Sequence, residues 1–255
     1  MALDSLAFCC LTIVPVRADH SDTAEIVTQL FFGELVKIID THQQWVKTEN
    51  LHDNYQGWVD RKQLLPFDKN TTDFPTDSNG YQQEEELTLL SPWGEQKVMQ
   101  GSPILSSKTS FKINNNTFTW KSDVPTKSNK SIPSIALSYL NVPYLWGGRS
   151  QYGIDCSGFS QTVYHQAGLF IHRDASQQVL QGKEVAFEEQ QEGDLAFFKS
   201  EISGKITHVG IVLSKGKIIH AHGRVRIDKL DKKGIYNEQE NYYSHKFYNV
   251  KRYIN

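Results

Sequence analysis

Short segments of alternating apolar and polar residues fill the first quarter of the chain, and each is bounded by turn-forming residues. They include residues 26–30, 35–39, 45–48 and 55–59. A period of two is typical of strands with one buried face, and strands this short and closely spaced favour a small antiparallel barrel. We therefore expect an all-β barrel over residues 1–67.

A polar, turn-rich segment at residues 68–82 interrupts this pattern and is interpreted as a linker. Further short apolar runs follow it, of which residues 87–90 and 117–120 are examples. These runs predict a second, smaller β-module over residues 83–123. A second polar stretch, residues 121–130, then leads into the rest of the chain.

Helical spacing of apolar residues begins after residue 130. Residues 133–140 and 157–167 each place apolar side chains on one stripe. Strand-like runs come afterwards, at residues 194–198, 209–213 and 217–220. Helices followed by strands indicate an α+β domain and not a repeated βαβ unit. We expect this domain over residues 131–255.

Charge and cysteine content limit the partners and the compartment. The chain has 27 basic and 29 acidic residues, so no overall basic field attracts nucleic acid or an anionic membrane. Three cysteines cannot form a disulfide framework, which favours a reducing, cytoplasmic location. The apolar stretch 6–16 is interpreted as a strand and not as a signal peptide, because Asp4 and no basic residue precedes it. No apolar run is long enough to span a bilayer.

One cysteine and two histidines have the spacing of a nucleophilic catalytic site. Cys156 lies where a loop becomes a helix, and the positive end of the helix dipole there should lower the pKa of its thiol. His208 begins a predicted strand and His220 lies on the next one, so a hairpin centred at Ser214 would pair them. A cysteine, a histidine base and a residue that orients this base make up a catalytic triad.

Each of these residues also has a plainer interpretation. A lone cysteine at a helix start is often a small buried apolar residue, and a single histidine is often an ordinary strand-end residue. His220 and His222 could be two metal ligands, but the sequence offers no evident third ligand beside them. We therefore expect neither a metal ion nor a cofactor. The coincidence of Cys156, His208 and His220 favours catalysis.

Four motifs follow one another in the last half of the chain. They are residues 143–148 (PYLWGG), 155–159 (DCSGF), 193–198 (GDLAFF) and 208–212 (HVGIV). Together they resemble the NlpC/P60 family of papain-like cysteine peptidases. The resemblance implies a papain-like fold, with Cys156 as nucleophile, His208 as general base and acid, and His220 as the residue that orients His208. His222 is the alternative for that third role.

The N-terminal barrel also has family features. Residues 33–34 (GE), 45–46 (WV) and 57–59 (GWV) resemble the bacterial SH3 (SH3b) module. Residues 83–123 are interpreted as a second, degenerate SH3b-like module, which lacks the Gly-Trp-Val hairpin. An SH3b module before an NlpC/P60 domain is similar to the γ-D-glutamyl-L-diamino acid endopeptidases, which cut cell-wall peptides after γ-D-glutamate. This resemblance implies that Tyr55 and Glu25 recognise a free N-terminal L-alanine at one end of the cleft. Their plainer interpretations are a surface tyrosine of the barrel and a solvated glutamate.

Further residues match substrate-contacting positions of that family. The resemblance places Tyr144 near the scissile bond, where it could help to hold the oxyanion, and it places Asp155 and Ser157 beside the nucleophile. Asp174 lies in a stretch that resembles the region around the γ-glutamyl carboxylate, although Ala175 stands where some relatives have serine. Helix capping is a competing role for Asp155.

The residues and the resemblance together favour a cytoplasmic cysteine peptidase that cleaves the γ-D-glutamyl–diamino acid bond during recycling of cell-wall peptides. Three alternatives stay open: a secreted peptidoglycan hydrolase anchored by SH3b modules, a binding protein with an inactive papain-like domain, and an amidase or acyltransferase on the same fold. The sequence does not distinguish between diamino acids.

Overall fold

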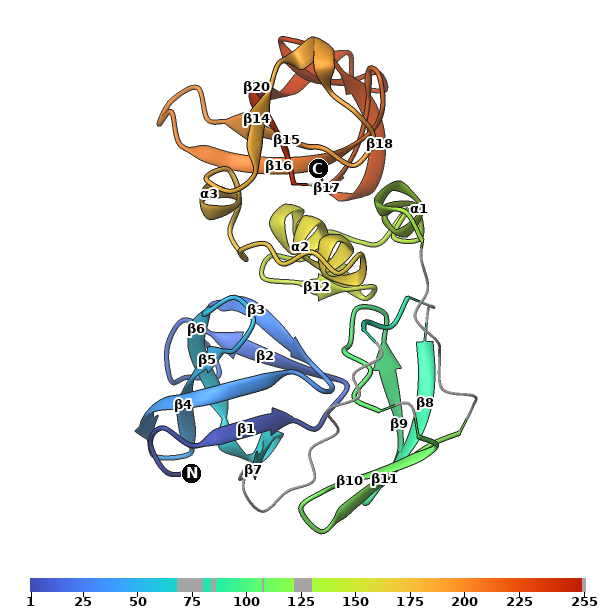
Figure 1. Cartoon of the computed structure of the whole chain (residues 1–255). Coiled ribbons are helices and arrows are strands. Elements are labelled where there is room, and N and C mark those ends of the chain that lie inside the picture. Colours follow the sequence, from blue (N-terminus) through green and yellow to red (C-terminus); the bar gives the residue numbers. More distant parts are fainter. Residues whose placement is uncertain (68–79, 84–85, 107, 122–129, 254–255) are drawn as a thin grey trace. The chain divides into compact units, whose positions relative to one another are not determined.

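The computed structural model describes residues 1–67, 80–83, 86–106, 108–121 and 130–253. The chain divides into two compact units, Met1–Asn129 and Lys130–Asn255, and each is described by itself (Figure 1). The linkers predicted at 68–82 and 121–130 lie largely outside the described residues. Among the helices that are described, none has both the length and the apolar character needed to cross a membrane.

The first unit begins with a seven-stranded antiparallel sheet in the order β3-β2-β6-β5-β4-β1-β7. Its strands are β1 (Leu6–Cys9), β2 (Ile13–Arg17), β3 (Ile26–Phe31), β4 (Leu35–His42), β5 (Trp45–Asn50), β6 (Gln56–Asp60) and β7 (Leu64–Phe67), with a 3-10 turn at Arg61–Gln63. The alternation seen in the sequence has the expected cause. In β2, for example, Val14 and Val16 are buried in the core while their neighbours are partly exposed.

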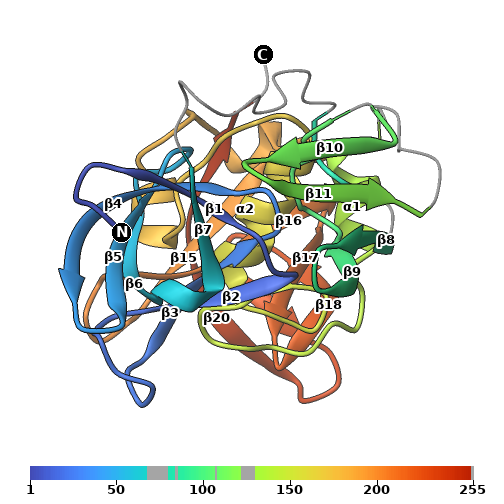
Figure 2. The same cartoon turned by 90° about the horizontal axis from the view of Figure 1, so that it is seen from below.

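A second sheet of four antiparallel strands, in the order β10-β11-β8-β9, completes this unit (Figure 2). Its strands are β8 (Glu86–Ser91), β9 (Gly94–Met99), β10 (Ser110–Ile113) and β11 (Asn116–Trp120). The two sheets share one apolar cluster, in which Phe8 and Phe32 pack with Phe118. Gln96 Nε2 also donates to the Cys10 carbonyl oxygen at 2.9 Å. Among the residues described, the second sheet is therefore packed on the first and shares its apolar core with it.

The second unit starts with its helices and two short strands. These elements are α1 (Ile132–Leu137), β12 (Arg149–Ser150), β13 (Gly153–Ile154), α2 (Cys156–Gln166) and α3 (Ala175–Gln178). Ser131 caps α1, and its Oγ accepts from the backbone N–H of Ser134 at 3.4 Å. Every residue of α2 is buried. This burial explains why a helix with few strongly apolar residues is held in place.

A seven-stranded antiparallel sheet follows the helices, in the order β14-β20-β15-β16-β17-β18-β19, with a further pairing between β19 and β20. Its strands are β14 (Lys183–Val185), β15 (Leu195–Lys199), β16 (Ile206–Ser214), β17 (Lys217–His222), β18 (Arg224–Leu230), β19 (Gly234–Asn237) and β20 (Tyr242–Arg252), with a 3-10 turn at Phe187–Glu189. Apolar residues of β15, β16 and β17 pack against α1 and α2 to form the main core of this unit. The unit is mostly β, with few helices.

Candidate active site

Cys156 is the first residue of α2, and the local sequence explains its position. Asp155 is the N-cap, and its Oδ1 accepts from the backbone N–H of Gly158 at 2.7 Å. A Cβ at Gly158 would lie 2.3 Å from the carbonyl oxygen of Gly148, so only glycine fits there. The cap and the close approach of the preceding loop together fix the start of the helix at the cysteine.

Asp155 and Ser157 are both bonded within the unit through Arg173. Arg173 Nη1 donates to Asp155 Oδ1 and to Ser157 Oγ, each at 3.0 Å, and Nη2 donates to Asp155 Oδ2 at 2.5 Å. The side chains of Arg173 and Asp155 are almost fully buried. Helix capping is thus an observed role of Asp155, whereas substrate contact by Asp155 and Ser157 stays a prediction. The contact between Arg173 and the capping residue Asp155 was not predicted from the sequence.

The prediction that the helix N-terminus lowers the pKa of Cys156 is wrong. Burial, with the nearby Asp155 carboxylate, raises the pKa of the Cys156 thiol to about 12. Backbone N–H groups of Val209 and Ser157 and the charge of Arg173 act in the lowering direction but do not offset the loss of water. The thiol is therefore protonated at neutral pH, and it needs a base to become a nucleophile.

The predicted base, His208, and the predicted orienting residue, His220, lie on β16 and β17. His208 Nε2 and His220 Nδ1 are 2.8 Å apart, and His220 Nε2 lies 2.9 Å from Asp228 Oδ2. The backbone N–H of Val209 is hydrogen-bonded to the Cys156 sulfur, so the residue that follows His208 in β16 contacts the cysteine. Burial, with neighbouring histidines, holds the pKa of His208 well below its usual value, so its ring is neutral.

The contact with Asp228 determines which ring nitrogens carry protons. Burial alone would raise the pKa of Asp228, but hydrogen bonds from His220 and Arg226 hold it below its usual value, so it accepts as a carboxylate. His220 must then carry its proton on Nε2 and accept at Nδ1 from His208 Nε2–H. His208 is left with an unprotonated Nδ1, the form that a general base requires. Asp228 and Arg226 were not identified from the sequence, where they are ordinary charged residues of a strand.

The hairpin has a different register from the one predicted. Ile211 pairs with Ile219, so the paired strands are centred at residue 215 and not at Ser214, and the register is irregular between Val212 and Ser214. His220 consequently lies beside Gly210, where a Cβ would be 2.8 Å from the His220 Cβ. The absence of a side chain at Gly210 leaves room for the diagonal contact between His208 and His220.

His222 lies farther from the base. The ring centroids of His208 and His222 are 6.5 Å apart, against 5.0 Å for His208 and His220. Of the two histidines considered for the third role, His220 is the one that is hydrogen-bonded to His208.

A fourth histidine, His245 on β20, was missed by the sequence analysis. Its ring stacks on that of His208 with centroids 3.9 Å apart and planes 21° apart. Burial, together with His220 and His222, lowers the pKa of His245 to about 3, so it too is neutral. No strand was predicted at its position, and its approach to His208 depends on the pairing of distant strands.

Three of these histidines offer a set of metal-binding atoms. One ligand nitrogen each of His208, His220 and His245 lies within 4.8 Å of the others. However, the facing nitrogens of His208 and His220 are already bonded to each other, and the second nitrogen of His220 is bonded to Asp228. A metal ion would have to replace these bonds. The arrangement as it stands is a chain of neutral imidazoles that ends on a carboxylate.

Tyr144 lies in the surroundings of the nucleophile. Burial, with the nearby Cys156 sulfur and the Asp155 carboxylate, raises the pKa of Tyr144 to about 12, so its phenol keeps its proton and can donate. Its side chain is partly exposed, and its backbone N–H donates to the Gly223 carbonyl at 3.0 Å. These features are compatible with the predicted contact to an oxyanion.

The other predicted substrate contacts lie farther along the chain or in the first unit. Asp174 is the N-cap residue of α3 but makes no side-chain capping hydrogen bond. Glu25 is exposed directly before β3, and Tyr55 is half-buried directly before β6. The roles of these three residues in substrate binding stay predictions.

Comparisons with known proteins agree with this geometry. Residues 141–251 match the NlpC/P60 family model, and residues 16–64 match the bacterial dipeptidyl-peptidase Sh3 domain. A γ-D-glutamyl-L-lysine dipeptidyl-peptidase of Bacillus subtilis is 30% identical over 77% of this chain and 72% of its own length. One of Bacillus cereus is 29% identical over 77% of this chain and 67% of its own length.

A solved structure shows the same fold over nearly the whole chain. It is an NlpC/P60 family protein from Bacillus cereus with a TM-score of 0.80 and 22% identity, and the match covers 98% of this chain and 100% of that one. Together with the sequence relatives, it confirms the resemblance seen in the motifs. The chain therefore belongs to the NlpC/P60 family and is a cysteine peptidase with an N-terminal bacterial SH3 domain.

Proposed function

We propose that this peptidase cleaves the γ-D-glutamyl–diamino acid bond of cell-wall peptides that begin with a free L-alanine. The observation that carries the proposal is the chain of contacts from His208 through His220 to Asp228 beside Cys156. The names of the two Bacillus relatives support the choice of bond. The papain-like description of the second unit is part of the same proposal.

The mechanism starts from a neutral thiol and a neutral imidazole. His208 Nδ1 takes the proton of Cys156 as the sulfur attacks the γ-glutamyl carbonyl carbon, and the carbonyl oxygen becomes an oxyanion. Backbone N–H groups at the start of α2 and the Tyr144 hydroxyl stabilise this charge. The Asp228 carboxylate, acting through the hydrogen bonds of His220, stabilises the positive charge that forms on His208 and thereby the transition state.

Collapse of this intermediate releases the first product. The C–N bond breaks, and His208 gives its proton to the leaving amine of the diamino acid, which leaves a thioester on Cys156. A water molecule then loses a proton to His208 and attacks the thioester carbonyl. Its collapse returns the proton to the sulfur and releases L-Ala-γ-D-Glu, so protein and protons return to the starting state.

The N-terminal barrel would provide selectivity. We assign recognition of the free α-ammonium to the Glu25 carboxylate, assisted by Tyr55, because an ion pair of this kind distinguishes a free amine from a blocked one. Substrates would then be peptides already released from the glycan, which suits recycling in the cytoplasm. The three cysteines support a reducing location, since none is in a disulfide.

A mass-spectrometric assay tests the proposal. The purified chain is incubated with L-Ala-γ-D-Glu-diaminopimelate, with the same tripeptide acetylated at its N-terminus, and with intact sacculi. We expect release of L-Ala-γ-D-Glu from the free tripeptide, at least tenfold slower cleavage of the acetylated one, and no release from sacculi. Efficient release of peptide from sacculi would contradict the proposal and favour a secreted wall hydrolase. The Cys156→Ala variant serves as the inactive control.

A further inference from the structure

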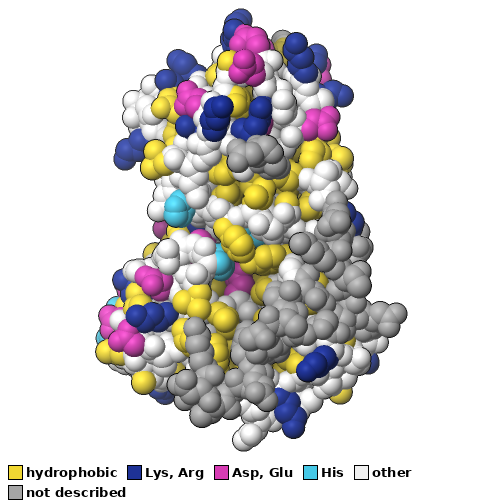
Figure 3. Space-filling view, viewed as in Figure 1, with side chains coloured by type: hydrophobic (Ala, Val, Ile, Leu, Met, Phe, Trp, Pro, Cys, Tyr) yellow, Lys and Arg dark blue, Asp and Glu magenta, His cyan; other side chains and the backbone are white. Residues whose placement is uncertain are grey.

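A basic cavity lies next to the catalytic histidines in the second unit. It has a volume of about 520 Å³, and its lining includes Lys199, Lys232, Lys233, Lys246, Glu201 and His245. Charged side chains of both signs are scattered over this unit in the view of Figure 3, so four lysines around one cavity are a local concentration. One acidic residue, Glu201, belongs to the same lining and pairs with Lys246 at 3.1 Å.

The positive charge of the cavity is only partly compensated. Lys232 is paired with Glu188, which does not line the cavity. The ammonium of Lys233 lies over the Tyr243 ring, 5.7 Å from its centroid, and that of Lys199 lies 5.3 Å from the centroid of Tyr248. An aromatic face attracts a cation but does not neutralise it. The cavity therefore presents an excess of positive charge to whatever enters it.

His245 connects this cavity with the reaction. It is part of the cavity lining, and its ring stacks on His208 at a centroid distance of 3.9 Å. His208 is the group that must protonate the departing amine, so the leaving group has to lie next to the ring of His208. His245 is therefore shared between the surroundings of His208 and the lining of the basic cavity.

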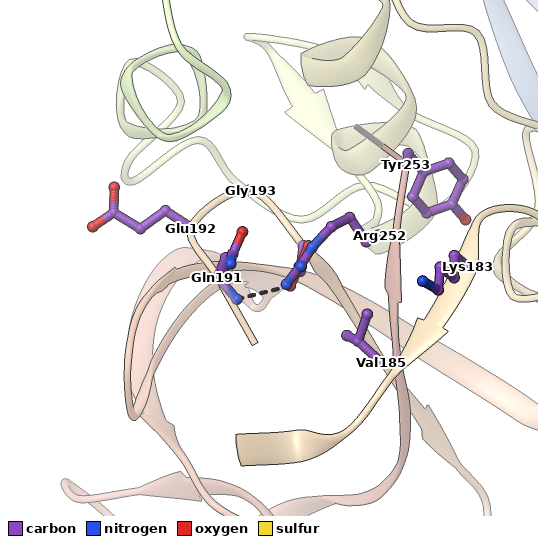
Figure 4. A pocket seen from close by; sticks show the side chains of 8 residues that line it. Lys183, Val185, Gln191, Glu192, Gly193, Arg252 and Tyr253 are labelled. Atoms are coloured by element: carbon purple, nitrogen blue, oxygen red, sulfur yellow. Dashed lines mark hydrogen bonds and ion pairs between the residues drawn. The ribbon is translucent and has the colours of Figure 1, made fainter. Parts of the chain in front are cut away.

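A second cavity of the same unit, of about 380 Å³, has none of these properties. Arg252, Lys183 and Tyr253 line it (Figure 4). The Arg252 guanidinium is paired there with Asp194, with Nη2 2.8 Å from Oδ2. It contains no residue of the catalytic chain. Of these two cavities of the described second unit, the basic one is the one whose lining contains a residue in contact with His208.

We infer that the basic cavity binds the distal end of the departing diamino acid and favours one with a second carboxylate, as in diaminopimelate, over lysine. This inference rests on the proposed function and names the diamino acid. The side chain of lysine ends in an ammonium alone, which four lysines would repel. The distal end of diaminopimelate carries a carboxylate beside its ammonium, so its net charge is zero. The lysines of the cavity attract this carboxylate, and this attraction offsets their repulsion of the ammonium.

Kinetics with two tripeptides test the inference. kcat/KM is measured for L-Ala-γ-D-Glu-meso-diaminopimelate and for L-Ala-γ-D-Glu-L-lysine, at low and at high ionic strength. We expect the wild type to prefer the diaminopimelate peptide roughly three- to tenfold, since exposed ion pairs each contribute a modest factor. The preference should shrink at high salt because these charges are exposed to solvent.

Two double variants separate the cavity from general charge effects. Lys233→Gln/Lys246→Gln removes two lysines of the lining and also frees Glu201 to attract an ammonium, so the preference should fall below twofold or reverse. Lys215→Gln/Lys217→Gln removes the same charge at exposed positions in and next to the β16–β17 turn, outside the cavity, and should leave the preference unchanged.

The outcomes test the cavity assignment and the proposed function separately. Cleavage of both peptides with no preference, or a preference that both double variants change equally, would overturn the cavity assignment but leave the proposed function in place. Failure of the wild type to cleave either peptide would overturn the proposed function, and the cavity assignment with it.

Discussion

Replacing Asp228 with asparagine should slow catalysis without removing any group that touches substrate. Asp228 accepts from two donor atoms, His220 Nε2 at 2.9 Å and Arg226 Nη2 at 2.9 Å, and its Oδ2 also forms an ion pair with Arg226, whose Nε lies 2.7 Å away. An asparagine has one oxygen and one NH2 group, so it cannot accept from both neighbours. Its NH2 must face either the Arg226 guanidinium or His220.

Each orientation of the asparagine has a cost. With the NH2 toward Arg226, donors and positive charge are brought together. With the NH2 toward His220, the asparagine donates to Nε2, and the proton of His220 moves to Nδ1. His208 must then accept at Nε2 and carry its own proton on Nδ1, the atom that should receive the proton of Cys156. The base is thereby held in its inactive tautomer.

The size of the effect follows from the lost hydrogen bond. A hydrogen bond to a charged group contributes about 1.5–3 kcal/mol. If the correct tautomer is disfavoured by this amount, kcat should fall roughly 10- to 150-fold. KM should change little because two residues, His208 and His220, separate Asp228 from the nucleophile in the chain of contacts. The loss should be smaller than the roughly ten-thousandfold loss for an aspartate that contacts the catalytic histidine directly.

Steady-state kinetics on the free tripeptide measures both constants. The control is Glu238→Gln, which removes an exposed carboxylate that pairs only with Lys229 in the described contacts and should leave kcat unchanged. Circular dichroism melting shows whether each variant is folded. A folded Asp228→Asn enzyme with kcat within threefold of the wild type would refute the assignment of tautomers.

Three more predictions concern the buried histidines and the ion pair between Arg173 and Asp155. His208→Ala should lower kcat at least about a thousandfold because the base is lost, whereas His220→Asn should lower kcat roughly 10- to 100-fold because an amide can still orient the His208 ring. Stopped assays on the tripeptide measure both values, and a smaller loss for His208→Ala than for His220→Asn would contradict the assignment. Arg173→Ala leaves Asp155 as an unpaired buried charge and should reduce the free energy of unfolding by about 3–5 kcal/mol in urea titrations, with a loss below 1 kcal/mol as the contrary result. The free energy of unfolding should also fall as the pH drops below about 6.5, because His208, His220 and His245 take up protons in the unfolded chain but stay neutral in the folded one. For three histidines the decrease is at most about 4 kcal/mol per pH unit, and equal free energies of unfolding in urea titrations at pH 7.5 and 5.5 would exclude this burial.

Local sequence signals were sufficient to predict that a helix starts at Cys156, and they predicted much of the fold. The loop, cap and glycine around Cys156 act within a few residues, so their effect on the helix start can be read directly. The alternation in the N-terminal strands likewise reflects which face of each strand is buried. Signals of this kind depend on neighbours in the chain and not on tertiary packing.

The hairpin register, the position of His245 and the pKa of Cys156 depend on tertiary packing and were not predicted correctly from the sequence. The register of His208 and His220 depends on where the β16–β17 turn lies and on the irregularity next to Ser214, and the sequence pattern predicted neither. His245 reaches His208 from a strand that was not predicted. The pKa of Cys156 rises because of burial, a property of the folded unit, and this outweighs the helix N-terminus that the sequence does reveal.

The most direct test of the central claim is the rate at which a Cys156→Ala variant releases the diamino acid from L-Ala-γ-D-Glu-diaminopimelate. The claim is that the Cys156 sulfur is the nucleophile and that the histidine chain serves it. We predict a loss of at least about a thousandfold relative to the wild type, with an unchanged circular dichroism spectrum. Cleavage by the folded variant within tenfold of the wild-type rate would contradict the account.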